Sequence, residues 1–291
     1  MTKDLTRGTP WKLILQFALP IMAGNLLQQL YNTADTIIVG NFNGQQALSA
    51  VGACASLTVL FTALAIGFSI GAGVLISQYF GASRERELRQ YAATAIVLML
   101  AMGLFMSLAG VVRARFLLER VLGPPEALLP MTHLYFRIYA AGLVFQFGYN
   151  IAAALLRALG DSKATLYFLL VSSILNVVLD LAFVAGLGLG VAGAAVATVI
   201  SQIASCVIGF AYMHRKYALL RFSLRELRLD VKTAGRILQV GAPMAIQQSI
   251  VSCGFLFLQR LVNLYGESMI ASYTVATQME TILMIPILGV Q

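Results

Sequence analysis

The stretch from Ala164 to Gly186, ATLYFLLVSSILNVVLDLAFVAG, decides the fold class. An apolar run of about 20 residues is long enough to cross a bilayer as a helix. This run contains one acid, Asp180, with Asn176 one helical turn before it on the same face. A carboxylate inside an apolar span costs roughly 2.5–3.5 kcal/mol on insertion scales, so it usually faces a bundle interior or an ion site. We therefore expect a transmembrane helix with a functional polar face; an acid satisfied by neighbouring hydroxyl groups for packing alone is the weaker alternative.

The composition excludes an ordinary soluble domain. Hydrophobic residues make up 59% of the chain and charged residues only 11%, and the mean hydropathy is +0.83. Soluble domains carry about 25% charged residues. Apolar runs near helix-spanning length recur, and the alternating segments of a porin-type barrel do not appear. The prediction is an all-α, polytopic membrane protein whose net charge of +8 reflects basic loops on one side of the membrane and not binding to nucleic acid.

Charge-free intervals and turn residues predict where the helices run. The turns are NFNGQQ at 41–46 and GLGLG at 186–190, since glycine and asparagine clusters break regular structure. Pro20 should kink the first helix, because proline removes one backbone hydrogen bond. The expected helices are, in order, 11–39, 48–80, 89–113, 131–155, 164–186, 191–213, 237–265, and one that begins near 269 and is still apolar at 291.

Basic residues set the expected orientation. Most of the 20 Lys and Arg residues lie before the first helix or after the second, fourth and sixth. By the positive-inside rule this side faces the cytoplasm, so we expect a multi-pass protein of the cell inner (plasma) membrane with a cytoplasmic N-terminus. The basic segment 215–236 has leucines at helical spacing, each followed by Arg or Lys. A helix lying on the anionic inner leaflet and a solvated charged linker explain it equally well.

The chain contains an internal repeat. FALPIMAGNLLQQ (17–29) aligns with VGAPMAIQQSIVS (240–252), which pairs Pro20 with Pro243, and further on Gly67 pairs with Gly289. Six predicted helices separate the copies, so both enter the membrane in the same direction and form a parallel repeat. The predicted domains are a six-helix lobe (1–214), the basic linker (215–236) and an incomplete second lobe (237–291). The acid of the first copy, Asp35, has no acidic counterpart in the second.

Five polar residues are predicted to lie at similar depth in the outer half of the first lobe. At about 1.5 Å per helical residue, four of them lie about 8–12 Å from the nearest outer turn or loop, and Asn176 lies one turn deeper. Two carboxylates in one desolvated site retain a shared proton readily, which makes a proton acceptor. The same oxygens could instead hold Na⁺, since hard cations prefer oxygen ligands. The predicted cation site consists of Asp35, Tyr135, Asn176, Asp180 and Thr198, with Na⁺ ligands at Asp35, Asn176 and Asp180.

Several stretches together resemble the multidrug and toxic compound extrusion (MATE) family. They are FALPIMAGNLLQQLYNTADTIIVGNF (17–42), GVLISQYFGA (73–82), LLRALGDSKATLY (155–167), NVVLD (176–180) and GVAGAAVATVIS (190–201). The resemblance covers the whole chain. It implies twelve helices in two lobes that form a V, and a secondary antiporter that exports organic cations or drugs in exchange for H⁺ or Na⁺. Matched by position, the cation site of the family falls on the same five residues that the depth argument collects.

The chain departs from the family pattern in two places. Many relatives carry an acid in the first half of helix 7, whereas QQSIVSC (247–253) has none. The last four helices of the family are absent, so the chain is expected to be a fragment, or to pair with a second copy or a missing C-terminal half. No HExxH motif occurs, and we expect neither an enzyme nor a bound cofactor besides the coupling ion. The alternatives are a transporter like the lipid-linked oligosaccharide flippases and a membrane fragment that transports nothing.

Overall fold

The computed structural model describes residues 10–122, 128–223, 226–263 and residue 280. Within these residues all regular secondary structure is helical, which confirms the all-α class. The helices are α1 (Pro10–Gly81), α2 (Glu85–Phe116), α3 (Leu129–Ala141), α4 (Leu143–Ala158), α5 (Ser162–Asp180), α6 (Gly190–Lys216) and α7 (Val231–Asn263). Wider π-helical turns extend α2 over Leu117–Leu122 and α5 over Leu181–Gly186.

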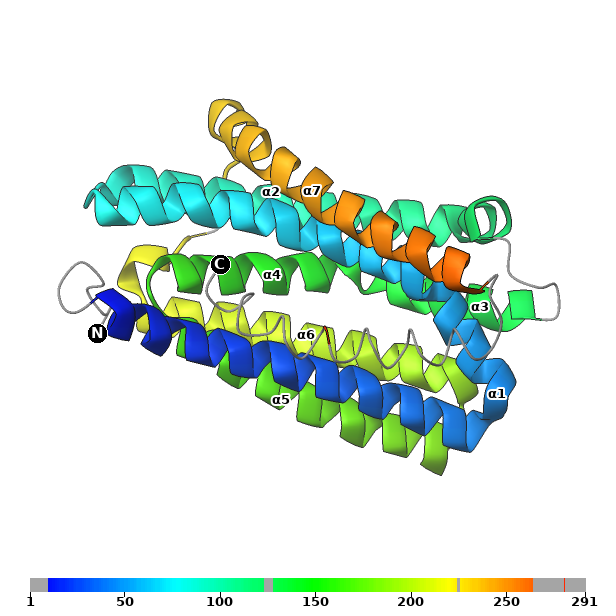
Figure 1. Cartoon of the computed structure of the whole chain (residues 1–291). Coiled ribbons are helices and arrows are strands. Elements are labelled where there is room, and N and C mark those ends of the chain that lie inside the picture. The colour runs from blue at the N-terminus through cyan, green and yellow to red at the C-terminus, as the bar shows by residue number, and fades with distance from the viewer. Residues whose placement is uncertain (1–9, 123–127, 224–225, 264–279, 281–291) are drawn as a thin grey trace.

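The helices lie side by side in an elongated bundle with two distinct ends (Figure 1). One end holds the start of α1, the turn between α4 and α5, and the segment that joins α6 to α7. We call it the basic end, because most of the Lys and Arg residues lie there. The other, which we call the opposite end, holds the bend of α1 and the turn between α5 and α6.

Several of these helices are long and apolar enough to span a membrane. In the described part of the chain four qualify by length and composition, and the bent pair α3 and α4 makes a fifth if it counts as one span. The four are Gln46–Gly81, Glu85–Arg120, Ser162–Gly186 and Gly190–Lys216. These spans confirm the prediction of a polytopic membrane protein.

The long helix α1 folds back on itself at Gly44. Gly44 has φ 78° and ψ −179°, a conformation that glycine adopts without the steric penalty of a Cβ atom. The break confirms the turn predicted at 41–46 and divides α1 into a first arm (10–43) and a second arm (45–81). Gly44 is the residue of α1 at which the backbone leaves helical dihedral angles. Pro20 is buried inside the first arm, and a kink there stays a prediction.

The single helix predicted over 131–155 is wrong, because the chain breaks at Gly142. The two halves, α3 and α4, are bent by 44° relative to each other. A Cβ atom on Gly142 would lie 2.6 Å from Cγ2 of Val199 on α6. Glycine therefore allows the bend to press against α6. The hydroxyl group of Ser107 on α2 donates to the carbonyl of Ala141 at 3.0 Å and so satisfies a backbone oxygen at the bend.

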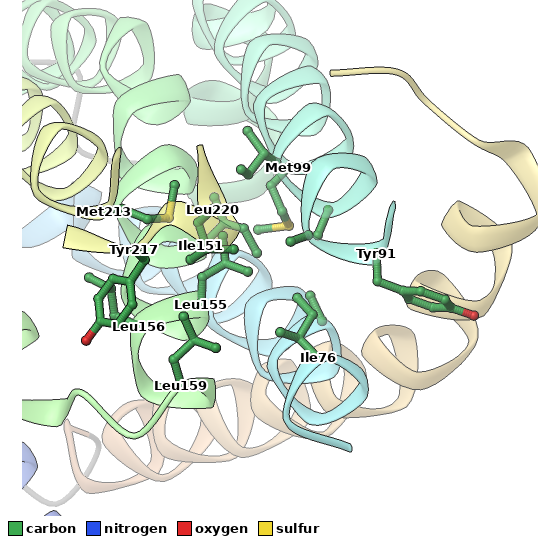
Figure 2. Close-up of a cluster of buried hydrophobic side chains, with 14 of the residues drawn as sticks. Ile76, Tyr91, Met99, Ile151, Leu155, Leu156, Leu159, Met213, Tyr217 and Leu220 are labelled. Carbon is green, nitrogen blue, oxygen red and sulfur yellow. The ribbon is translucent and has the colours of Figure 1, made fainter. Parts of the chain in front are cut away.

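Two hydrophobic clusters hold the bundle together, one near each end. Figure 2 shows the cluster at the basic end, where side chains from α1, α2, α4, α6 and the following turn meet. Its members include Ile76, Met99, Ile151, Leu155, Met213 and Leu220. The second cluster, near the opposite end, contains Phe61, Tyr135, Phe136 and Tyr139. The predicted cation site borders this second cluster, since Tyr135 belongs to both.

The segment between α6 and α7 is docked on α2. Its described residues form a short 3₁₀ turn at Ala218–Leu220 and otherwise irregular backbone, so the interfacial helix suggested for 215–236 is not found there. The guanidinium of Arg89 donates to the carbonyls of Leu219 and Arg221, both at 3.1 Å, and to Oε1 of Glu226 at 2.9 Å. These contacts satisfy carbonyl groups that a helix would have bonded internally.

The helix α7 packs against the second arm of α1 at unusually close range. A Cβ atom on Gly67 would lie 2.3 Å from the Cα atom of Ala245, and one on Gly71 would lie 2.3 Å from that of Gly241. Small residues four apart on both helices allow the backbones to touch, as in membrane helix pairs. Of the repeat, Pro243 lies inside α7, whereas Gly289 lies outside the described residues. The division into two lobes stays a prediction.

Candidate functional site

The structure brings Asp35 and Asp180 together. Asp35 lies on the first arm of α1 and Asp180 is the last residue of α5, and α5 packs along α1. The two carboxyl groups interact electrostatically. Asp180 is fully buried and Asp35 is partly buried. Two acids from distant parts of the sequence thus share one buried location, which we call the acid pair.

Local backbone structure places Asp180 at a change of helix type. The α-helical hydrogen bonding of α5 ends at Asp180, and a π-helical turn begins at Leu181. Single π turns within helices occur frequently at functional sites. Beyond this turn, Gly188 and Gly190 have φ values of 64° and 60°, which the predicted GLGLG turn needs in order to reverse the chain into α6.

Among the described residues, the acid pair and its neighbour Asn176 carry buried polar atoms with no hydrogen-bond partner outside the pair itself, in which the two carboxyl groups can share a hydrogen bond. They are Oδ1 of Asp35, both carboxylate oxygens of Asp180, and Oδ1 and Nδ2 of Asn176. Asn176 is only 2% exposed. More than nine-tenths of buried polar groups in proteins are paired, because an unpaired one costs about 1–3 kcal/mol. Oxygen atoms left unpaired in this way can bind a small cation or a proton.

Tyr135 and Thr198 differ in how closely they approach the acid pair. Tyr135 on α3 is buried and interacts electrostatically with Asp35. Thr198 lies on α6, which packs against α5, and its hydroxyl donates to the carbonyl of Ala194 in its own helix at 3.0 Å. The geometry therefore joins Asp35 and Asp180 directly, places Tyr135 within electrostatic range of Asp35, and places Asn176 one turn from Asp180. It leaves Thr198 on the adjacent helix, bonded to backbone.

Sequence reasoning missed a hydrogen-bonded cluster beside Tyr135. The hydroxyl of Tyr139 donates to Oε1 of Gln146 at 3.1 Å, and Nε2 of Gln146 donates to Oγ1 of Thr62 at 2.7 Å. These residues come from α3, α4 and the second arm of α1. The sequence does mark Gln146, because an uncharged amide inside an apolar span also needs hydrogen-bond partners. The expectation that polar groups in such spans face the bundle interior applies to Gln146 as it does to Asp180.

At the basic end, a third acid has every partner that the acid pair lacks. Asp161 caps the start of α5 by accepting from the backbone N–H of Ala164 at 3.2 Å. Its Oδ2 atom accepts from Tyr212, Lys216 and Tyr217 at 2.9, 2.8 and 2.6 Å. Burial alone would raise the pKa of Asp161, but these hydrogen bonds stabilise the carboxylate and lower its pKa below the ordinary value. Asp161 is a structural carboxylate.

Helices long and apolar enough to span a membrane, a bent helix pair and a buried acid pair define a class: the polytopic α-helical membrane proteins. The family model MatE matches residues 20–182. The chain therefore belongs to the MATE family, as the sequence resemblance indicated. MATE proteins are transporters and not enzymes, which confirms that expectation as well.

Individual relatives agree with this assignment. The chain is 30% identical over 283 residues to the probable multidrug resistance protein YpnP of Bacillus subtilis, a match that covers 97% of this chain and 63% of YpnP. An outward-facing multidrug resistance MATE transporter of the MOP superfamily superposes with a TM-score of 0.90 and 28% identity, over 100% of this chain and 65% of that one. A MOP superfamily transporter from Pyrococcus furiosus, described as having a binding pocket of reversed polarity, superposes with a TM-score of 0.89 and 29% identity. This match also covers 100% of this chain and 65% of that one. The chain spans less than two thirds of the length of these relatives.

Proposed function

We propose that the chain forms the first lobe and the beginning of the second lobe of an antiporter that exports organic cations or drugs in exchange for H⁺ or Na⁺. Membership of the MATE family and similarity to a probable multidrug resistance protein support this proposal. The protein resides in the inner membrane of the cell. Its basic end faces the cytoplasm, because Lys and Arg accumulate on that side. A second copy or a C-terminal half supplies the remaining helices.

The observation that carries the proposal is the acid pair with its unpaired oxygens. Two ionised carboxylates in one buried site repel each other, so the empty site is unfavourable. A proton or Na⁺ neutralises part of this charge and satisfies oxygens that lack donors. If the outward- and inward-open states hold this ion with different affinity, binding shifts the equilibrium between them. The carboxylate charge also attracts a cationic substrate once the coupling ion has left.

Each predicted site residue has a role in this scheme. Asp35 and Asp180 accept the proton or bind Na⁺, and the amide oxygen of Asn176 is a third ligand. Tyr135, which lies within electrostatic range of Asp35, borders the site from α3, and the hydroxyl oxygen of Thr198 completes the polar surface from α6. Pro20 lets the first arm of α1 bend as the ion binds, since its missing hydrogen bond weakens the helix there. No cofactor other than the coupling ion takes part.

The two alternatives from the sequence make different demands on the site. A flippase for lipid-linked oligosaccharides does not require two acids in contact inside the membrane. A fragment that transports nothing gains no stability from buried oxygens without partners. The acid pair therefore favours the ion-coupled exporter.

Efflux of a fluorescent lipophilic cation from pump-deficient cells that express the chain tests the proposal. We expect Asp35→Asn and Asp180→Asn each to reduce energised efflux at least tenfold at equal membrane levels. Glu85→Gln, which removes an exposed acid of α2, should retain wild-type efflux. Removing Na⁺ and collapsing the proton gradient in separate experiments identify the coupling ion. Undiminished efflux in both Asp variants would overturn the proposal, and no efflux from wild type would favour the fragment.

A further inference from the structure

The bend between α3 and α4 is bridged by side chains as well as by backbone contacts. Tyr139 precedes the bend and Gln146 follows it, and the hydroxyl of Tyr139 donates to Oε1 of Gln146 at 3.1 Å. This hydrogen bond links the two halves of the broken helix across Gly142. The 44° angle is thus fixed from two sides, by the close contact of Gly142 with α6 and by this bridge.

Thr62 ties the bridge to the second arm of α1. Its Oγ1 atom accepts from Nε2 of Gln146 at 2.7 Å, donates to the carbonyl of Thr58 at 2.8 Å, and lies 3.4 Å from the hydroxyl of Tyr139. The donors run in one direction, from Tyr139 through Gln146 and Thr62 to the backbone. Because every member has a partner, such a network holds a defined geometry.

The cluster lies one helical turn from Tyr135 on α3. Tyr135 and Tyr139 are four residues apart on α3, and their rings stack with centroids 6.4 Å apart and planes inclined by 9°. Tyr135 in turn interacts electrostatically with Asp35. A rotation of α3 about its axis would move both tyrosines together, so fixing the hydroxyl of Tyr139 fixes the approach of Tyr135 to Asp35.

We propose that Thr62, Tyr139 and Gln146 form a positioning cluster that holds Tyr135 against the acid pair and fixes the cation site to the second arm of α1. The inference rests on the proposed cation site at Asp35 and Asp180. None of the three residues contacts the ion; they act through Tyr135 and through the angle between α3 and α4. The second arm of α1 is also the arm that meets α7 at Gly67 and Gly71, so the cluster connects the site to the contact with the second repeat.

The test compares variants that remove a single hydroxyl group. Tyr139→Phe keeps the ring stack and Thr62→Val keeps the shape of the side chain, whereas Thr62→Ser restores the hydroxyl. Tyr167→Phe is the matched control, since Tyr167 on α5 is 61% exposed. The readout is the rate at which a hydrophobic carbodiimide, which reacts with protonated carboxyl groups, labels Asp35 in the full chain in liposomes, measured by peptide mass spectrometry. Asp161 at the basic end, whose hydrogen bonds keep it ionised, should label slowly in every variant and is the negative reference.

We expect Tyr139→Phe and Thr62→Val to change the labelling rate of Asp35 at least threefold, with that of Asp161 unchanged. Thr62→Ser and Tyr167→Phe should label as wild type does. The double variant Tyr139→Phe with Thr62→Val should change the labelling rate of Asp35 no more than the single variant with the larger change, because both substitutions act through one cluster. Wild-type rates in Tyr139→Phe and Thr62→Val, or equal changes at Asp35 and Asp161, would overturn the proposal. If Tyr139→Phe does not fold, the contrast between Thr62→Val and Thr62→Ser decides alone.

The same experiment separates this inference from the proposed function. If labelling of wild-type Asp35 and Asp180 responds neither to Na⁺ nor to pH, the cation site is wrong whatever the cluster variants do. If it responds but the hydroxyl variants do not alter it, the cation site stands and the positioning cluster is wrong.

Discussion

The helix α5 begins and ends beside an aspartate, and the two residues have opposite surroundings. Asp161, which caps its start, accepts hydrogen bonds from three side chains and one backbone amide. Asp180, which is its last residue, is fully buried, and no described residue other than Asp35 is a hydrogen-bond partner of its carboxyl group. Two aspartates on one helix thus differ in their partners: the carboxylate at the start of α5 is fully hydrogen-bonded, and the one at its end is not.

This difference separates a structural acid from a functional one. A carboxylate surrounded by donors stabilises the fold in its ionised form and gains nothing from a further ligand. A buried carboxylate without donors destabilises the fold unless something else binds to it. Three expected results would sharpen or break this comparison, and they are ordered by the size of the effect.

Removing the carboxylate of Asp161 should have the largest effect on stability. Asp161→Ala leaves Lys216 and two tyrosine hydroxyl groups without their acceptor and removes the cap of α5. Since Lys216 is partly exposed, we expect a loss of about 2–3 kcal/mol. The midpoint of thermal unfolding in detergent should fall by roughly 5 °C. The exposed control Glu85→Ala should stay within about 1 °C of wild type, and an equal fall in both variants would contradict the assignment.

Removing the charge of Asp180 should have a smaller effect of the opposite sign. Asp180→Asn keeps the shape of the side chain and removes a buried acid that is repelled by Asp35 and receives no hydrogen bond from the other described residues. We expect stability to rise by about 1 kcal/mol, which raises the unfolding midpoint by roughly 2 °C at pH 8. A fall as large as that of Asp161→Ala would mean that Asp180 is a structural acid too.

The smallest effect is the dependence of stability on pH through Asp161. Because its folded-state pKa is lowered, its carboxylate contributes stability that is present above the unfolded-state pKa of about 4 and disappears as the pH falls through the folded-state value. The difference in unfolding midpoint between wild type and Asp161→Asn should therefore be constant from about pH 5 to pH 8 and shrink below about pH 4. A difference that already shrinks between pH 7 and pH 5 would contradict the lowered pKa.

Much of the fold follows from the sequence because membrane helices can be recognised by their length and apolar composition. The turns at Gly44 and at Gly186–Gly190 are found where glycine and asparagine predicted them. The break at Gly142 could not be predicted in this way. It has no proline, and it depends on the contact of Gly142 with Val199, a residue far away in the sequence.

The site was predictable to a similar degree, for a different reason. Acids inside apolar spans are rare enough to mark Asp35 and Asp180, and counting residues from the turns gave their depth. Depth alone does not say which helices are neighbours. The electrostatic contact of the acids and the bond of Thr198 to its own backbone therefore needed the structure. The cluster of Thr62, Tyr139 and Gln146 escaped notice because hydroxyl and amide groups in helices are common, and only their mutual distances distinguish them.

The close contact between α7 and the second arm of α1 also bears on how the protein is made. A ribosome delivers the helices to the membrane in chain order, and in the described part of the chain α7 follows the helices that it touches, which are α1 through Gly67 and Gly71, and α2. The first helix of the second repeat therefore finds its docking surface already assembled when it enters the bilayer. Because glycines make that surface smooth, α7 can settle without reordering side chains that are already packed. During biosynthesis the two repeats can thus come into contact as soon as α7, the first helix of the second repeat, enters the membrane.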